Sequence, residues 1–318
     1  MNRAADRPPT AAGDLLRIGR EAQAALDGGR PIVALESTLI THGLPYPQNL
    51  DAARRAEAAV RGGGAVPATV ALHGRRIRVG LEGSELAALA EARDLAKVSR
   101  QTLAAALARQ DWAGTTVAAS LVAAQLAGIR VFATGGIGGV HRGGERSMDI
   151  SADLAEIARS PVAVVCAGPK SILDVPRTME LLETLGVPVV GWATDDLPGF
   201  FSRTSGGRVP SRVDTAPEAA ALVERQRTLG LGGVLFCVPL PEDVALPRGE
   251  ANAAIDQAIR DSEAAGIHGP ASTPWVLGRV AELTEGRSVV ANLALIEHNA
   301  AVAAAIAVAL NAMSAAAG

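Results

Sequence analysis

The stretch Val162-Ala-Val-Val-Cys-Ala-Gly-Pro-Lys-Ser171 decides the fold class of this 318-residue chain. Its first five residues are apolar without polar alternation, which is typical of a strand buried on both faces of a parallel sheet. A Gly-Pro turn and Lys170 follow directly. Because ligands of open α/β sheets bind beyond the carboxyl ends of the strands, polar residues that follow such runs are the candidate functional residues.

Comparable apolar runs recur along the chain and alternate with alanine-rich amphipathic segments. We expect strands at Ile32–Leu35, Thr69–Leu72, Arg78–Val79, Val131–Thr134, Val162–Cys166, Val187–Trp192 and Gly233–Val238. We expect helices at Asn49–Arg61, Ser84–Glu91, Thr116–Ala127, Ser151–Ser160, Ser171–Leu185, Pro274–Leu283 and Asn292–Met313. His73-Gly-Arg-Arg76 predicts a hairpin turn. This alternation predicts an α/β fold: a three-layer α/β/α sandwich around a mostly parallel, mixed sheet.

The ends of the chain suggest a short arm and a single domain. Residues 1–13 are predicted to be a disordered arm without a secretory apolar core. No linker or internal repeat divides residues 14–318, which we expect to form one domain. The apolar stretch Ala300–Leu310 is too short to span a bilayer. We therefore expect a cytoplasmic protein with no membrane partner.

Composition disfavours a nucleic-acid partner and a disulfide framework. The net charge is -3, and aromatic residues make up only 3% of the chain, too few for base-stacking platforms. Both cysteines, Cys166 and Cys237, lie in apolar runs and are interpreted as small core residues in a reducing compartment.

Lysine is the rarest basic residue of the chain. Of the 30 Lys and Arg residues, only two are lysines, Lys97 and Lys170. A surface charge is satisfied by either residue, but only lysine can lose its proton and become a nucleophile. Two explanations are therefore open for the two remaining lysines: one or both take part in amine chemistry, or compositional drift spared two surface lysines. For Lys170 the chemical interpretation is favoured, because a strand end and an expected helix start both favour a neutral amine, as a Schiff-base lysine requires.

Glu36 directly follows the apolar run Ile32–Leu35. Burial among apolar neighbours disfavours the charged carboxylate and raises its pKa, which suits a general acid. The alternative is a structural glutamate that accepts hydrogen bonds from loop amides. His42, farther along the same loop, is interpreted as a hydrogen bonder that orders it.

The glycine-rich loop from Thr134 to Arg142 follows another strand. Such a loop exposes backbone amides to an anion, although tight strand–helix turns also need glycine. It matches neither a dinucleotide fingerprint nor a P-loop. With His141 and Arg142 added, a phosphate or sugar-phosphate site is favoured, so Thr134 and His141 are candidate substrate-binding residues.

Asp149, Ser151 and Asp153 follow this loop. Two carboxylates and a hydroxyl could hold a hard divalent cation through oxygen ligands and waters. They could equally cap the helix that begins there, and the two interpretations do not exclude one another.

Together these segments resemble the pseudouridine-5′-phosphate glycosidase family, which includes indigoidine-synthase-A-like members. The resemblance runs from about residue 31 to 305, on the motifs VALESTLITHGLPYPQN, AVPATVAL, GTTVAAS, FATGGIGGVHRG, DISADL, VVCAGPKSILD, LETLGVPVVGW, TPWVLGRV and ANLALIEHNAA. It implies reversible cleavage of the C–C glycosidic bond of pseudouridine 5′-phosphate to uracil and ribose 5-phosphate, with one divalent metal, Mn²⁺, per subunit. It also implies a homotrimer.

Carried over by motif, Lys170 resembles the nucleophile that forms an imine with the ribose C1′. Glu36 resembles the acid that protonates the departing uracil carbon, and Asp149 the metal ligand, acting mainly through waters. Lys97 resembles a cation for the substrate phosphate. The other positions similar to substrate-binding ones are Val117, Ser151, Ala152, Asp153 and Asn292.

Two departures from the family pattern point to an altered substrate preference: Val238 in place of a polar group, and Thr102 after Lys97, where an aspartate is usual. Two other functions remain open. One is a Schiff-base aldolase for another sugar phosphate that uses the same lysine. The other is an inactive sugar-phosphate-binding protein.

Overall fold

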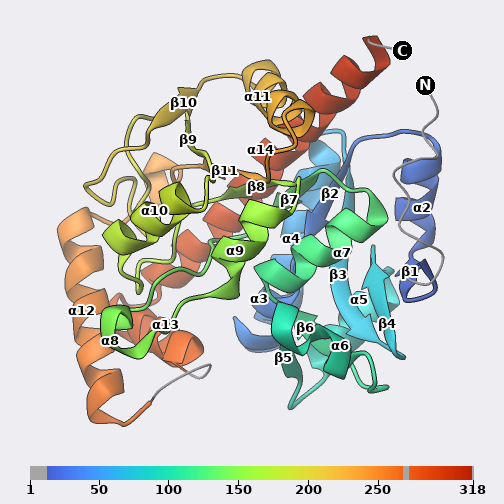
Figure 1. Ribbon diagram of the computed structural model, residues 1–318. Coiled ribbons are helices and arrows are strands. Elements are labelled where there is room, and N and C mark those ends of the chain that lie inside the picture. The colour runs from blue at the N-terminus through green and yellow to red at the C-terminus, as the bar shows by residue number, and fades with distance from the viewer. Residues whose placement is uncertain (1–12, 268–271, 317–318) are drawn as a thin grey trace.

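The computed structural model describes residues 13–267 and 272–316, and its strands form one eleven-stranded sheet (Figure 1). The strands are β1 (Leu16–Ile18), β2 (Ile32–Leu35), β3 (Val66–His73), β4 (Arg76–Val79), β5 (Ala96–Val98), β6 (Ala113–Thr115), β7 (Val131–Ala133), β8 (Ala163–Cys166), β9 (Val189–Trp192), β10 (Ser211–Val213) and β11 (Val234–Cys237). Their order is β1-β4-β3-β2-β7-β8-β11-β9-β10, with β6 also paired to β3 and β5 to β6.

The sheet is mixed but mostly parallel, because only the β3–β4 and β3–β6 pairs are antiparallel among the described strands. The predicted hairpin joins β3 to β4 through Gly74 and Arg75, whose φ angles are both positive, at 62° and 61°. Two consecutive residues with positive φ are what a type I′ hairpin turn requires. The predicted hairpin is confirmed.

Helices cover both faces of the sheet (Figure 1). The face that Figure 1 turns to the viewer carries α7 (Val117–Ala127), α9 (Ala152–Arg159) and α10 (Val175–Thr184), and its core also includes α2 (Arg20–Asp27). The opposite face carries α4 (Gln48–Gly62), α11 (Ala216–Thr228), α12 (Arg248–Ala264), α13 (Ser272–Leu283) and α14 (Arg287–Ala316). The remaining helices are α3 (Thr38–His42), α5 (Gly83–Glu91), η1 (Arg100–Thr102), α6 (Leu103–Ala106), α8 (Gly144–Ser147) and η2 (Glu242–Val244).

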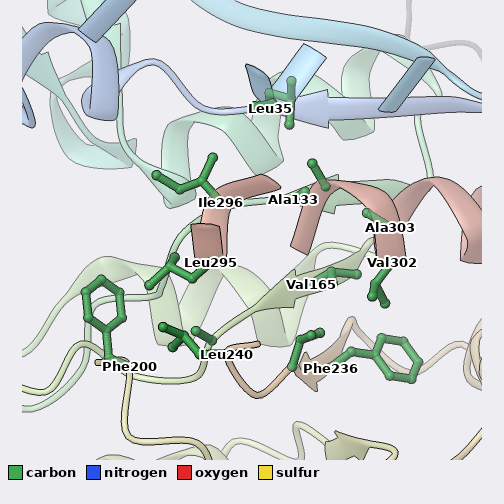
Figure 2. Close-up of a cluster of buried hydrophobic side chains, with 14 of the residues drawn as sticks. Leu35, Ala133, Val165, Phe200, Phe236, Leu240, Leu295, Ile296, Val302 and Ala303 are labelled. Carbon is green, nitrogen blue, oxygen red and sulfur yellow. The ribbon is translucent and has the colours of Figure 1, made fainter. Parts of the chain in front are cut away.

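Successive side chains of each central strand point to opposite faces of the sheet, so the core is divided between these two helix layers. In β2, Val33 and Leu35 join the core under α14, whereas Ile32 and Ala34 join the core under α7 and α9. Figure 2 shows the first of these cores, where side chains of α14 meet those of the strands. Both faces of the central strands are therefore buried, and the predicted three-layer α/β/α sandwich is confirmed.

The long helix α14 passes beneath the centre of the sheet (Figure 1). By length and apolar composition alone it could cross a membrane, but 56% of its most apolar window is buried inside the fold. The stretch Ala300–Leu310 is thus part of a 30-residue helix, longer than the sequence pattern indicated. Its apolar surface is explained by packing against β2, β7 and β8.

The structure adds elements that the sequence analysis missed and moves several helix starts, of which that of α10 matters most for the site. The missed strands β1, β5, β6 and β10 have three residues each, too few to show a period. Helix α10 begins at Val175, after its N-cap Asp174, and not at Ser171. Lys170 therefore does not lie at a helix N-terminus, and the helix-dipole argument for its neutral amine was wrong.

Two further predictions concern the ends of the chain and the cysteines. The predicted arm, residues 1–13, lies outside the described residues except for Gly13, and the single-domain assignment stays a prediction. Cys166 and Cys237 are fully buried, free and in register on β8 and β11. Their interpretation as core residues is confirmed.

Candidate active site

Three adjacent parallel strands, β2, β7 and β8, end at the same edge of the sheet. Glu36 follows β2, Thr134 follows β7, and Lys170 lies in the loop after β8. The Thr134 hydroxyl donates a hydrogen bond to Oε1 of Glu36. The sheet thus brings together three residues that lie far apart in the chain.

Glu36 is a carboxyl group with a raised pKa. Burial is the main cause, because it penalises the charged form, and the negative charge of Asp153 acts in the same direction. The positive charges of Lys170 and Lys97 and the hydrogen bond from Thr134 oppose the shift. A carboxyl group that keeps its proton to higher pH than usual is suited to general acid catalysis, and the raised pKa agrees with the sequence prediction.

A cavity of about 20 Å³ adjoins Glu36. Its polar lining comes from Glu36, Thr69 and Thr134, and the rest is apolar. The volume suits a single water molecule and is far too small for a sugar phosphate.

Lys170 is held by the backbone of the loop between β8 and α10. Its amide donates to the Ile137 carbonyl over 3.1 Å, and its own carbonyl accepts from Leu173 over 3.0 Å. Gly168, two residues earlier, has a φ of 85°, which a residue with a side chain rarely adopts. These contacts join the lysine loop to the glycine-rich loop that contains Ile137.

Lys97 comes from the short strand β5 and is partly buried. Burial lowers the pKa of its ammonium, and the charge of Lys170 lowers it further. Glu36 and Asp153 act in the opposite direction. Both lysines of the chain therefore lie within electrostatic reach of the same carboxyl group, Glu36.

The N-terminus of α7 lies beside Lys97, because the Thr116 amide donates to the Val98 carbonyl over 2.9 Å. Thr116 caps the helix, and Val117, its first residue, is 1% exposed. A helix N-terminus next to an ammonium favours an anion.

Asp153 is buried and joins two of these segments. Its Oδ1 accepts from the Ala118 amide and its Oδ2 from the Gly138 amide, each over 2.9 Å. The Ser151 hydroxyl accepts from the Asp153 amide and caps α9, whose first residue is Ala152. The capping interpretation is confirmed for Ser151, and Asp153 fixes the glycine-rich loop against α7.

Asp149 follows the glycine-rich loop, with its side chain 52% exposed and its Oδ2 4.0 Å from Nδ1 of His141. The two residues are also joined by the backbone, where the His141 amide donates to the Asp149 carbonyl. Within residues 13–267 and 272–316, no three His, Cys, Asp or Glu side chains cluster as a metal site. A cation at Asp149 would thus take most of its ligands from water or substrate.

The long helix α14 places two asparagines against the end of β7. Asn292, which the sequence analysis selected, has its amide oxygen 3.8 Å from the position that a Cβ on Gly135 would occupy. Asn299, which it did not select, is 1% exposed and donates from Nδ2 to the carbonyls of Thr134 and Gly135 over 2.9 and 3.2 Å. The sequence signal that could have identified Asn299 is an amide on the apolar face of an expected helix.

Other side chains selected from the sequence have structural roles. His42 contacts the Leu95 carbonyl and the Thr41 hydroxyl, so it orders its loop as expected. Val238 is completely buried in the core, and Thr102 accepts a hydrogen bond from the Ser99 amide. Neither departure from the family pattern therefore introduces a side chain into the carboxyl and lysine cluster.

Comparisons with known proteins show the family to which the chain belongs. The family model described as "Indigoidine synthase A like protein" matches residues 21–309. A pseudouridine-5′-phosphate glycosidase of Sorangium cellulosum is 54% identical over 95% of this chain and 96% of its own. A protein of the same name from Staphylococcus aureus is 48% identical over 93% of this chain and 97% of its own.

Two solved structures share the fold. The prealnumycin C-glycosynthase AlnA, solved in complex with ribulose 5-phosphate, is 40% identical with a TM-score of 0.88, over 95% of this chain and 99% of its own. An indigoidine synthase A-like protein of Thermotoga maritima is 35% identical with a TM-score of 0.83, over 93% of this chain and 97% of its own. On these matches, which extend over nearly the whole chain, the protein is an enzyme of the indigoidine synthase A-like family.

Proposed function

We propose that this enzyme cleaves the C–C glycosidic bond of pseudouridine 5′-phosphate and releases uracil and ribose 5-phosphate. The observation that carries the proposal is the electrostatic contact between Glu36, with its raised pKa, and Lys170, which follow β2 and β8 on either side of β7. The names of relatives about 50% identical to this chain supply the substrate.

Lys170 is the proposed nucleophile. Its amine adds to C1′ of the ribose as the bond from C1′ to the ring oxygen breaks, and that oxygen takes up a proton. The nitrogen lone pair then forms a C1′=N imine while the bond to uracil breaks. A carbon leaving group is poor, so covalent catalysis divides one difficult cleavage into easier steps.

Glu36 is the proposed acid. It protonates the uracil carbon as that carbon leaves, and a water molecule then adds to the imine and frees ribose 5-phosphate. Over the cycle one water is consumed, and the lysine amine is regenerated. The hydrogen bond from Thr134 fixes one oxygen of the carboxyl group, so that the other is free to face the substrate.

The substrate phosphate is proposed to lie between Lys97 and the N-terminus of α7. The proposed phosphate ligands are Lys97, Val117 and the segment Ser151–Asp153. Thr134 and His141 of the glycine-rich loop and Asn292 of α14 are proposed to bind the rest of the substrate. Positive charge and helix amides there are complementary to a phosphate.

Asp149 is the proposed ligand for a divalent cation such as Mn²⁺. An exposed carboxylate with room for waters fits a hard cation held mainly through water. The cation would supply positive charge beside the substrate oxygens. We further propose that the enzyme acts in the cytoplasm as a homotrimer.

The test is incubation with pseudouridine 5′-phosphate and Mn²⁺, followed by measurement of uracil. Borohydride should trap ribose 5-phosphate on Lys170. Aldehyde formation from another sugar phosphate without uracil release would instead indicate a Schiff-base aldolase. Tight product binding without turnover would indicate a binding protein.

A further inference from the structure

The sheet-facing stripe of α14 contains one fully buried amide, that of Asn299, among apolar residues. Leu295, Ile296, Val302 and Ala303 of this stripe pack against the strands, as Figure 2 shows. Asn299 lies between these two apolar pairs in the sequence and is 1% exposed. An apolar side chain would suit this environment better, so the amide needs an explanation.

The contacts of Asn299 fix the orientation of its amide. Nδ2 donates to the carbonyls of Thr134 and Gly135, and the reversed orientation would place an oxygen against both acceptors. Its Oδ1 is buried and has no hydrogen-bond partner among the described residues. The side chain therefore leaves one polar atom unsatisfied while it holds the carbonyls of two consecutive peptide units, Thr134–Gly135 and Gly135–Gly136.

The first of these peptide units contains the carbonyl of Thr134, the residue whose hydroxyl contacts Glu36. The Thr134 amide donates to the Val165 carbonyl over 3.0 Å, and its carbonyl accepts from Asn299, so its backbone is held on both sides. Its hydroxyl then reaches Oε1 of Glu36. On the far side, Gly135 lies so close to α14 that a Cβ there would be 3.2 Å from Leu295 Cδ1.

We propose that Asn299 is a positioning residue for the acid, because it holds the Thr134–Gly135 peptide so that the Thr134 hydroxyl stays hydrogen-bonded to Glu36. The proposal rests on the function proposed above, in which Glu36 protonates the departing carbon. Asn299 itself acts through Thr134 and is distinct from Asn292, which lies two helical turns earlier.

The test compares Asn299→Leu with Thr134→Val and with the double variant. Each single change should lower kcat about 10- to 100-fold with little change in KM, because a misplaced catalytic group loses rate rather than binding. The double variant should be no slower than the slower single variant, because both changes remove the same contact. Asn311→Leu, farther along α14, is the matched control and should leave kcat unchanged.

Two readouts separate positioning from a loss of folding. Borohydride trapping of ribose 5-phosphate on Lys170 should persist in Asn299→Leu, because imine formation does not need the acid. The basic limb of the pH profile should move to higher pH, because the lost Thr134 contact had favoured the charged carboxylate. Lys170, Lys97 and Asp153, the other charges that face Glu36, remain in place.

An Asn299→Leu enzyme with the wild-type kcat and pH profile would overturn the proposal, as would full additivity in the double variant. If the leucine variant does not fold, Asn299→Ala serves in the same comparisons. If the wild-type enzyme releases no uracil, the proposed function fails instead. A ¹³C-NMR titration of the Glu36 carboxyl in the free enzyme then tests the positioning role without turnover. The midpoint of this titration should rise in both single variants. A midpoint that rises in Thr134→Val but stays unchanged in Asn299→Leu would refute the positioning role.

Discussion

Lys97 and Lys170, the only lysines of the chain, lie within electrostatic reach of each other, and the charge of both acts on Glu36. Lys97 arrives on the short strand β5 and Lys170 in the loop after β8. Both lysines of this lysine-poor chain therefore belong to the same site. The two residues nevertheless differ in their proposed roles, since only Lys170 is assigned a covalent step.

Replacement of Lys170 by alanine should abolish covalent trapping. Without the amine no imine can form, and we expect uracil release to fall by roughly 10³-fold or more, as for other catalytic nucleophiles. Mass spectrometry after borohydride reduction with ribose 5-phosphate checks the adduct. An adduct that survives Lys170→Ala would refute the imine mechanism.

Lys97→Arg tests whether the second lysine is a charge or an amine. If Lys97 binds the phosphate as a cation, arginine should keep kcat within about tenfold and mainly change KM, because the positive charge remains while its geometry differs. Steady-state kinetics with pseudouridine 5′-phosphate give both constants. A collapse of kcat with KM unchanged would indicate that Lys97 takes part in the chemistry.

Glu36→Gln should lower kcat by about 10²- to 10⁴-fold, the usual contribution of general acid catalysis. In the wild type, kcat should fall as pH rises through the raised pKa of Glu36, because the acid loses its proton. The kcat–pH profile of the variant should lack this limb. An unchanged limb would assign it to another group.

The same substitution should stabilise the fold at high pH. A carboxyl group whose pKa is raised in the folded state favours folding below its unfolded pKa, and this contribution is lost as pH rises through the folded pKa. Glu36→Gln removes the buried charge, so its melting temperature should exceed that of the wild type at pH 8, with a smaller difference near pH 4.5. Calorimetry at the two pH values checks the sign.

Chelation should remove activity that added Mn²⁺ restores, and Asp149→Asn should require more Mn²⁺ because a neutral amide binds a hard cation more weakly. Titration of uracil release against Mn²⁺ gives the apparent affinity. Glu145→Gln, also on the exposed segment before α9, is the control and should leave that affinity unchanged. Activity unaffected by chelator would exclude the metal requirement.

Sequence and structure agree best where the signal is local. The run Ile32–Leu35 coincides with β2, because four buried apolar residues in succession are distinctive. The start of α10 was wrong because Asp174 and Pro176 provide a stronger helix start than Ser171. Asn299 was missed because a single amide in an alanine-rich helix has no period, and its partner Gly135 lies 164 residues earlier in the chain.

The sequence by itself determined that Glu36, Thr134 and Lys170 each follow a buried strand, since hydrophobic periodicity and turn residues act over a few neighbouring positions. Only the tertiary structure decided that these strands are adjacent, in the order β2-β7-β8. Strand order depends on pairing between distant segments, for which no local pattern codes. The same long-range packing brought Lys97, Asp153 and Asn299 to the site, and so set the electrostatic environment of Glu36.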